Sequence, residues 1–150
     1  KNAMNVSSFM SKVAVTVTPN TPLPQVWKLI FNKHIHGLPV VDKNKKLIGI
    51  ISEEDLLNKL FPGYDELGTN ESLPLDDEDL ISEKLTKLKK WTAEKVMNRR
   101  VIYTQPDTNI MRALSRMLAR RVRQLPVIDD QDHIVGIISK ADVFRGLFKK

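Results

Sequence analysis

Two short segments place a hydroxyl three residues before a carboxylate: Ser52 precedes Asp55, and Ser139 precedes Asp142. An ionised aspartate offers two acceptor oxygens, which suit paired hydrogen bonds from the 2′ and 3′ hydroxyls of a ribose. The serine and the free N–H groups of a helix start can favour a phosphate. The same spacing is that of a capping box, in which both side chains bond only to the backbone. On these residues alone, the capping box is the simpler interpretation.

Basic side chains recur before two strand-like apolar segments. Lys33, His34 and His36 precede the first, and Arg120, Arg121 and Arg123 precede the second. Arg123 can bind a phosphate through two parallel hydrogen bonds, whereas His36 would help most when protonated. Cations at a helix end also complement the helix dipole without any ligand. Both interpretations stay open.

The residue patterns of common catalytic sites do not occur in the sequence. It has no Gly-rich phosphate loop, no nucleophile elbow, and no His-x-x-x-His or Cys-x-x-Cys pair. His34 and His36 are two residues apart, which is a poor spacing for joint metal ligation from a helix. We therefore expect neither an enzyme nor a metal site, and no catalytic residue is assigned.

Composition restricts the class of protein. The 150 residues are 41% hydrophobic and 28% charged, which is enough to bury an interior. Without cysteine there are no disulfides, and we expect a cytoplasmic protein. No apolar run approaches a membrane span, and Lys1-Asn2-Ala3 before Met4 resembles an expression remnant. A net charge of +6 suits nucleic acid or phosphorylated small molecules, or only solvated lysines.

An internal repeat organises the chain. Residues 10–61 align without a gap with residues 97–148, at a constant offset of 87 and with 14 identities in 52 positions. Such gapless similarity rarely arises by chance, so the chain contains two copies of one unit. We expect a tag remnant and lead-in at 1–9, copies at 10–61 and 97–148, and a linker with an amphipathic helix at 62–96.

Each copy has the same pattern of elements. An extended stretch (13–17 or 101–104) runs to a proline, and a helix with apolar residues at i, i+3, i+4, i+7 and i+8 follows. Two strands (38–41 and 47–51, or 125–128 and 134–138) and a closing helix complete the copy. Near-continuous branched apolar residues suggest strands buried on both faces. The order is β-α-β-β-α, twice, in the α/β (α+β) class.

The linker is a different kind of sequence. Pro62-Gly63 ends the preceding helix, and residues 65–74 are polar and loop-like. An amphipathic stretch with Ile81, Leu85 and Leu88 begins with acids and ends with lysines, which suits the helix dipole. We interpret the acidic run at 76–79 as the start of this helix rather than as a metal site.

These residues resemble a known family. Each copy resembles the CBS domain in three features: a Met-led strand and a helix, then Leu-Pro-Val-hydrophobic-Asp, then Gly-Ile-Ile-Ser-x-x-Asp. Two such copies in one chain resemble a Bateman module. The resemblance implies two motifs about a pseudo-twofold axis, with two clefts that often bind AMP, ADP, ATP or related adenosyl compounds. It further implies a regulatory ligand, no obligatory cofactor, and a separate regulated protein.

The resemblance also assigns ligand-binding residues. Each cleft is expected to take its aspartate from one copy and its base and phosphate contacts from the other. Ser139 and Asp142 would then work with Ile35 and His36, and Ser52 and Asp55 with Val122 and Arg123. The expected apolar walls are Ala14, Val15, Ile35 and Pro39 in one cleft, and Val101, Ile102, Val122 and Pro126 in the other. In this context we favour ribose binding for at least one aspartate.

Other functions compete with nucleotide sensing. A ligand-free interaction module is the main alternative. Nucleic-acid binding is suggested by seven arginines between Arg99 and Arg123, but no series of aromatic stacking residues is interleaved with them and no nucleic-acid motif is recognised. We also expect a homodimer, a disc of four CBS motifs, because Leu60-Phe61, Leu147-Phe148, Trp27, Phe31 and Met117 suggest more than one apolar contact surface. The alternative is that the linker helix covers this patch, or a cleft opening, within one chain.

Overall fold

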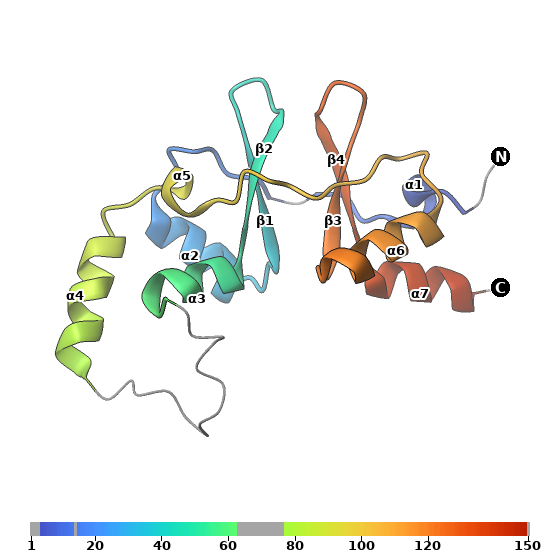
Figure 1. The fold of residues 1–150 in the computed structure, drawn as a ribbon. Coiled ribbons are helices and arrows are strands. Elements are labelled where there is room, and N and C mark those ends of the chain that lie inside the picture. The colour runs from blue at the N-terminus through green and yellow to red at the C-terminus, as the bar shows by residue number, and fades with distance from the viewer. Residues whose placement is uncertain (1–3, 14, 63–76, 150) are drawn as a thin grey trace. The chain divides into compact units, whose positions relative to one another are not determined.

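A computed structural model describes residues 4–13, 15–62 and 77–149 (Figure 1). Its elements are α1 (Val6–Phe9), α2 (Leu23–Phe31), β1 (Gly37–Val41), β2 (Leu47–Ser52), α3 (Glu53–Leu60), α4 (Glu78–Leu88), α5 (Ala93–Val96), α6 (Ile110–Arg120), β3 (Gln124–Ile128), β4 (Ile134–Ser139) and α7 (Lys140–Phe148). They form two compact units. Unit 1 comprises residues 1–16, 41–48 and 100–150, and unit 2 comprises 17–40 and 49–99. Each unit therefore takes chain from both copies of the repeat.

Two two-stranded sheets, β1-β2 and β3-β4, correspond to the predicted strand pairs. In the second sheet the strands are antiparallel, with Pro126 opposite Ile137. Every residue of β1 is buried, as is nearly all of β3, whereas β2 and β4 contain both buried and half-buried residues. The prediction of strands buried on both faces therefore holds only for the first strand of each pair.

The predicted extended stretches are reduced to single parallel bridges, Val17 with Val40 and Thr104 with Val127. The N–H of Thr104 donates to the Pro126 carbonyl at 2.9 Å, and the N–H of Ile128 donates to the Thr104 carbonyl at 3.0 Å. The next bond in this register would need an N–H from Pro126, which proline lacks. The ladder therefore stops after one residue.

The segment that opens each copy pairs with a strand of the other copy. In unit 1, Ser11 and Ile137 exchange two backbone hydrogen bonds of 2.8 Å each. In unit 2, Ile50 and Asn98 do the same at 3.0 and 2.8 Å. A Cβ on Gly49 would lie 2.8 Å from the Met97 sulfur, and Gly136 faces Met10 in the same way. The glycine of each Gly-Ile-Ile-Ser segment therefore makes room for the methionine of the exchanged segment.

Short helices α1 and α5 extend the repeat beyond the expected boundaries, because they too lie 87 residues apart. Val6, in α1, is fully buried in unit 1, and its N–H donates to the Thr108 carbonyl at 2.8 Å. Ala93, in α5, is fully buried and donates to the Thr21 carbonyl at 2.9 Å in unit 2. Parts of the expected lead-in and linker thus belong to the two cores.

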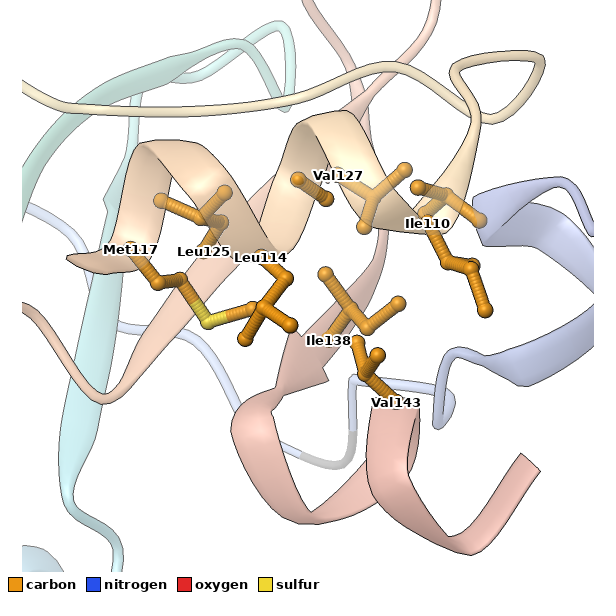
Figure 2. Packing of buried hydrophobic residues seen from close by; sticks show 9 residues of the cluster. Ile110, Leu114, Met117, Leu125, Val127, Ile138 and Val143 are labelled. Carbon is orange, nitrogen blue, oxygen red and sulfur yellow. The ribbon is translucent and has the colours of Figure 1, made fainter. Parts of the chain in front are cut away.

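Figure 2 shows the core of unit 1, where side chains of α6 and α7 meet those of β3 and β4. Its buried members are Val6, Ile110, Ala113, Leu114, Met117, Leu125, Val127, Ile138 and Val143. In unit 2 most of the positions 87 residues away are also buried, among them Leu23, Val26, Ile30, Leu38, Val40, Ile51 and Leu56. The helical spacing read in the sequence is thus the spacing of both cores.

The inserted helix α4 forms where the sequence predicts it. Asp77 caps its start by accepting a hydrogen bond from the Leu80 N–H at 3.0 Å, so this acid has the expected helix-start role. Leu88 is buried, and the Lys84 ammonium donates to the Leu60 carbonyl at 2.8 Å, which fixes α4 to α3 within unit 2. No helix among the described residues is long and apolar enough to cross a membrane.

Candidate functional site

Ser52 and Asp55 form a complete capping box at the junction of β2 and α3 in unit 2. The Ser52 hydroxyl accepts from the Asp55 N–H at 3.2 Å. Asp55 Oδ2 in turn accepts from the Ser52 N–H at 2.8 Å and from the Ser52 hydroxyl at 2.9 Å. The capping function inferred from the spacing is therefore present, and it uses Oδ2 of the carboxylate.

Ser139 and Asp142 repeat this box at the junction of β4 and α7 in unit 1. The Ser139 hydroxyl accepts from the Asp142 N–H at 3.0 Å, and Asp142 Oδ2 accepts from the Ser139 N–H at 2.9 Å. The second oxygen, Oδ1, accepts a hydrogen bond from the guanidinium of Arg145. Asp142 is only 8% exposed, so the positively charged guanidinium of Arg145 lies beside a largely buried carboxylate.

Arg123 lies beside the same helix start in unit 1. Its carbonyl accepts from the Lys140 N–H at 3.1 Å, so its backbone touches the first turn of α7. The Arg123 and His36 side chains are exposed, and neither takes part in an ion pair within the described chain. Both are thus accessible to an anion. The pairing of Asp55 with Arg123, and of Asp142 with His36, stays a prediction.

A left-handed residue precedes each of these two cations. His34 and Arg121 both have φ of 56°, and Arg121 ends α6 by donating its N–H to the Met117 carbonyl. The chain thus turns sharply at equivalent positions before entering β1 and β3. Sequence reasoning missed these turns because neither position holds the glycine that normally marks a left-handed helix end.

The residues expected as apolar walls divide into two groups. Pro39 and Pro126 are buried within β1 and β3. The others that the structure describes are half-buried: Val15, Ile35, Val101, Ile102 and Val122. Ile102 and Val122 also pack against the core of unit 1, so the fold alone requires them to be apolar. Ala14 lies outside the described residues.

Metal ligation finds no support in the described ranges, where no group of three His, Cys, Asp or Glu side chains could hold an ion. The arrangement instead offers a carboxylate and a hydroxyl at each of two helix starts, together with exposed cations. These groups can bind vicinal hydroxyls and phosphate oxygens.

Known proteins share this organisation. The CBS domain model matches residues 6–62 and 93–149, three quarters of the chain. The uncharacterized protein MJ1426 of Methanocaldococcus jannaschii is 32% identical, with 96% of this chain and 91% of that protein covered. CBSX2, a chloroplastic CBS domain-containing protein of Arabidopsis thaliana, is 31% identical over 86% of this chain and 56% of its own. The chain spans 46% of another relative, MJ0188 of M. jannaschii.

Solved structures show the same fold. CBSX2 in complex with AMP has a TM-score of 0.74 and 25% identity, with 97% of this chain and 96% of that chain covered. The CBS domain pair of MJ0100, solved with 5′-methylthioadenosine and S-adenosyl-L-methionine, has a TM-score of 0.67 and 28% identity, with 97% and 95% covered. This chain, with one CBS domain at 6–62 and a second at 93–149, therefore belongs to the CBS domain family.

Proposed function

We propose that the chain is a regulatory module that binds AMP, ADP, ATP or a related adenosyl ligand and modulates a separate partner protein. The observation that carries this proposal is the duplicated box, in which Asp55 and Asp142 occupy the same place at two strand-to-helix junctions. The related pairs solved with AMP and with 5′-methylthioadenosine and S-adenosyl-L-methionine support it, because these ligands share an adenosine.

In this proposal each aspartate accepts the ribose hydroxyls, and Arg123 or His36 contacts phosphate. A carboxylate has two acceptor oxygens, so it can accept one hydrogen bond from each of two vicinal hydroxyls. The exposed guanidinium of Arg123 stays charged at all physiological pH values, whereas His36 is charged only when protonated. The module binds its ligand without transforming it, so ATP incubated with the protein is recovered intact.

Isothermal titration of AMP, ADP, ATP and S-adenosylmethionine tests this function with the variants Asp55→Asn and Asp142→Asn. Asparagine keeps one acceptor oxygen, so the capping box survives while paired binding to a ribose is lost. We expect each variant to lose one nucleotide site, or to bind the nucleotide there at least about tenfold more weakly. This is the effect expected when a hydrogen bond to a charged group is lost. Asp130→Asn, an exposed acid of the β3-β4 turn, is the matched control. If no such ligand binds the wild-type protein at millimolar concentration, the proposed function is wrong.

A second function, a ligand-free interaction module, is favoured by a different observation. Unit 1 exposes Met111, Leu118, Phe144 and Phe148, with 48, 58, 45 and 85% of their surface accessible. An apolar surface of this kind commonly marks an interface. We propose that it forms a homodimer contact, which is compatible with either function. Leu60 and Met117, which the sequence suggested for such a surface, are instead buried in the units.

A further inference from the structure

A hollow of about 230 Å³ lies in unit 1, outside all the residues assigned so far. The segment before α6 and the exposed side of α6 form its lining: Tyr103, Thr104, Gln105, Thr108, Arg112 and Arg116. Arg112 and Arg116 are one helical turn apart and therefore lie on one face of α6. The hollow thus combines two guanidinium groups with hydroxyl-bearing side chains.

Neither arginine forms an ion pair with a carboxylate of the described residues. The ion pairs within the described ranges join Arg99 to Glu94, Arg145 to Asp142 and His133 to Asp129. The guanidinium of Arg116 instead lies 5.8 Å from the centre of the Tyr103 ring. Asp107, the acid nearest in sequence, lines a different hollow. Two uncompensated positive charges therefore border this hollow.

Thr104 is the least expected residue of this lining. It is only 6% exposed, and its backbone N–H and carbonyl are both used in the bridge to β3. Its hydroxyl has no hydrogen bond to any described residue. Among the described residues, the buried side-chain oxygen without a partner belongs to Asn5 and not to Thr104, so the Thr104 hydroxyl is open to the hollow rather than sealed in the fold.

The repeat provides an internal comparison. At the offset of 87, Val17 takes the place of Thr104 and is 5% exposed. Gln25 and Leu29 take the places of Arg112 and Arg116, and Thr16 takes that of Tyr103. The first copy builds the same bridge and the same helix without these residues, so the fold does not require them. Four differences between the copies converge on one hollow.

We propose that this hollow binds a phosphoryl group, either as free phosphate or as part of a small phosphorylated compound. Guanidinium groups match phosphate oxygens with parallel charge-assisted hydrogen bonds. The Thr104 hydroxyl in the lining supplies one further donor. The site uses none of the residues proposed for the adenine nucleotide, so it stands independently of that function.

The first copy supplies the test variants, Thr104→Val and Arg112→Gln. Binding of inorganic phosphate, pyrophosphate and glycerol 3-phosphate to the full chain is measured by isothermal titration, with melting temperatures recorded in parallel. We expect the wild type to bind at least one probe and Arg112→Gln to bind it about tenfold more weakly. Thr104→Val should also weaken binding while leaving the melting temperature of the unliganded protein nearly unchanged, because valine fills the same place at Val17 in the first copy.

Arg120→Gln, which removes the same charge from the next turn of α6, is the control and should bind like wild type. Tighter binding of glycerol 3-phosphate than of phosphate identifies a phosphorylated compound as the ligand, and the reverse order identifies free phosphate. The proposal is overturned if no probe binds at concentrations up to about 10 mM. It is also overturned if Thr104→Val and Arg112→Gln both bind the probe as tightly as the wild type. It is also overturned if Asp142→Asn abolishes phosphate binding, because the hollow would then not be a separate site.

Discussion

At the scale of single residues, one contact distinguishes the two capping boxes. Oδ1 of Asp142 accepts a hydrogen bond from Arg145, whereas the residue 87 positions earlier is Asn58. The Arg145 side chain is 68% exposed, and such pairs contribute little to folding. The arginine nevertheless occupies the oxygen that a second ribose hydroxyl would need. The proposed ligand and Arg145 therefore compete for Asp142.

Removing this competitor should strengthen nucleotide binding. For Arg145→Gln we expect the affinity for AMP to rise by up to about fivefold, since an exposed pair is worth at most about 1 kcal/mol. Isothermal titration of the variant and the wild type measures the change, and Lys149→Gln controls for the lost charge. A weaker affinity would contradict the prediction and would show that Arg145 itself contacts the ligand.

Two further aspartates hold the turns between paired strands. Oδ1 of Asp42 accepts from the N–H groups of Asn44 at 2.8 Å and Lys46 at 3.0 Å. Oδ1 of Asp129 accepts from those of Gln131 at 2.9 Å and His133 at 3.0 Å. These hydrogen bonds, chiefly from the Lys46 and Gln131 N–H groups, lower the pKa of both carboxyls below the usual 3.8.

A lowered pKa has a definite consequence for stability. The stabilisation by Asp42 and Asp129 is complete above the ordinary pKa of 3.8, which applies to the unfolded chain, and is lost as the pH falls through the lower pKa values of the folded protein. We expect Asp42→Asn with Asp129→Asn to lose less stability than the wild type between about pH 5 and about pH 3. Urea denaturation at both pH values measures this. Equal losses in the two proteins would exclude a role for these turns.

The sequence predicts these residues unevenly. The boxes at Ser52 and Ser139 could be predicted because capping is local and its spacing is fixed. The contact of Arg145 with Asp142 could not, because an i,i+3 pair is one of many that a helix allows. The hollow around Thr104 was also missed, although the offset alone aligns a threonine with a valine there.

At the scale of elements, α1 depends on a close fit to α7. The Phe9 ring lies over Gly146, where any Cβ would overlap it. Alanine in place of glycine within a helix ordinarily stabilises by about 1 kcal/mol. Here the ring must move out of a packed site, which costs roughly 1–3 kcal/mol. Whether Gly146→Ala raises or lowers the free energy of unfolding therefore shows whether α1 is packed on α7.

We expect Gly146→Ala to lower the free energy of unfolding by about 1 kcal/mol, measured in urea. Replacing Phe9 with valine, the residue at the equivalent position Val96, should remove the overlap. In the Phe9→Val background, Gly146→Ala should therefore be neutral or stabilising. A destabilisation of equal size in both backgrounds would contradict the packing of Phe9 on Gly146.

The longer elements could be predicted because their apolar periods are local. Helices α2 and α6 show the spacing of a buried face, and α4 begins at an aspartate as expected. Helices α1 and α5, with four residues each, are too short to show a period. The exchange of opening segments between the copies also escaped prediction, because a repeat shows which segments are alike but not which ones pair.

At the scale of the whole molecule, the two copies differ in how their apolar surfaces are covered. In unit 2, α2 and α4 together line a groove of about 250 Å³ with Leu23, Pro24, Trp27, Lys28, Leu85, Leu88 and Lys89. The inserted helix thus lies against part of the first copy. In the second copy, Met111 and Leu118 on α6 are exposed. The expected alternative of coverage by the linker therefore applies to one copy at most.

The surface of α6 and α7 that exposes Met111, Leu118, Phe144 and Phe148 is the one through which we expect the protein to dimerise. A twofold axis would bury this side of each protomer against itself and remove Leu118 and Phe144 from water. We expect light scattering behind a sizing column to give twice 17.2 kDa at protein concentrations on the order of tens of micromolar. Leu118→Glu with Phe144→Glu should give 17.2 kDa with an unchanged circular dichroism spectrum. Leu80→Glu, which changes another exposed leucine, on α4, should leave the dimer intact. A wild-type mass of 17.2 kDa would refute the dimer, and a dimer that survives the double variant would exclude this surface.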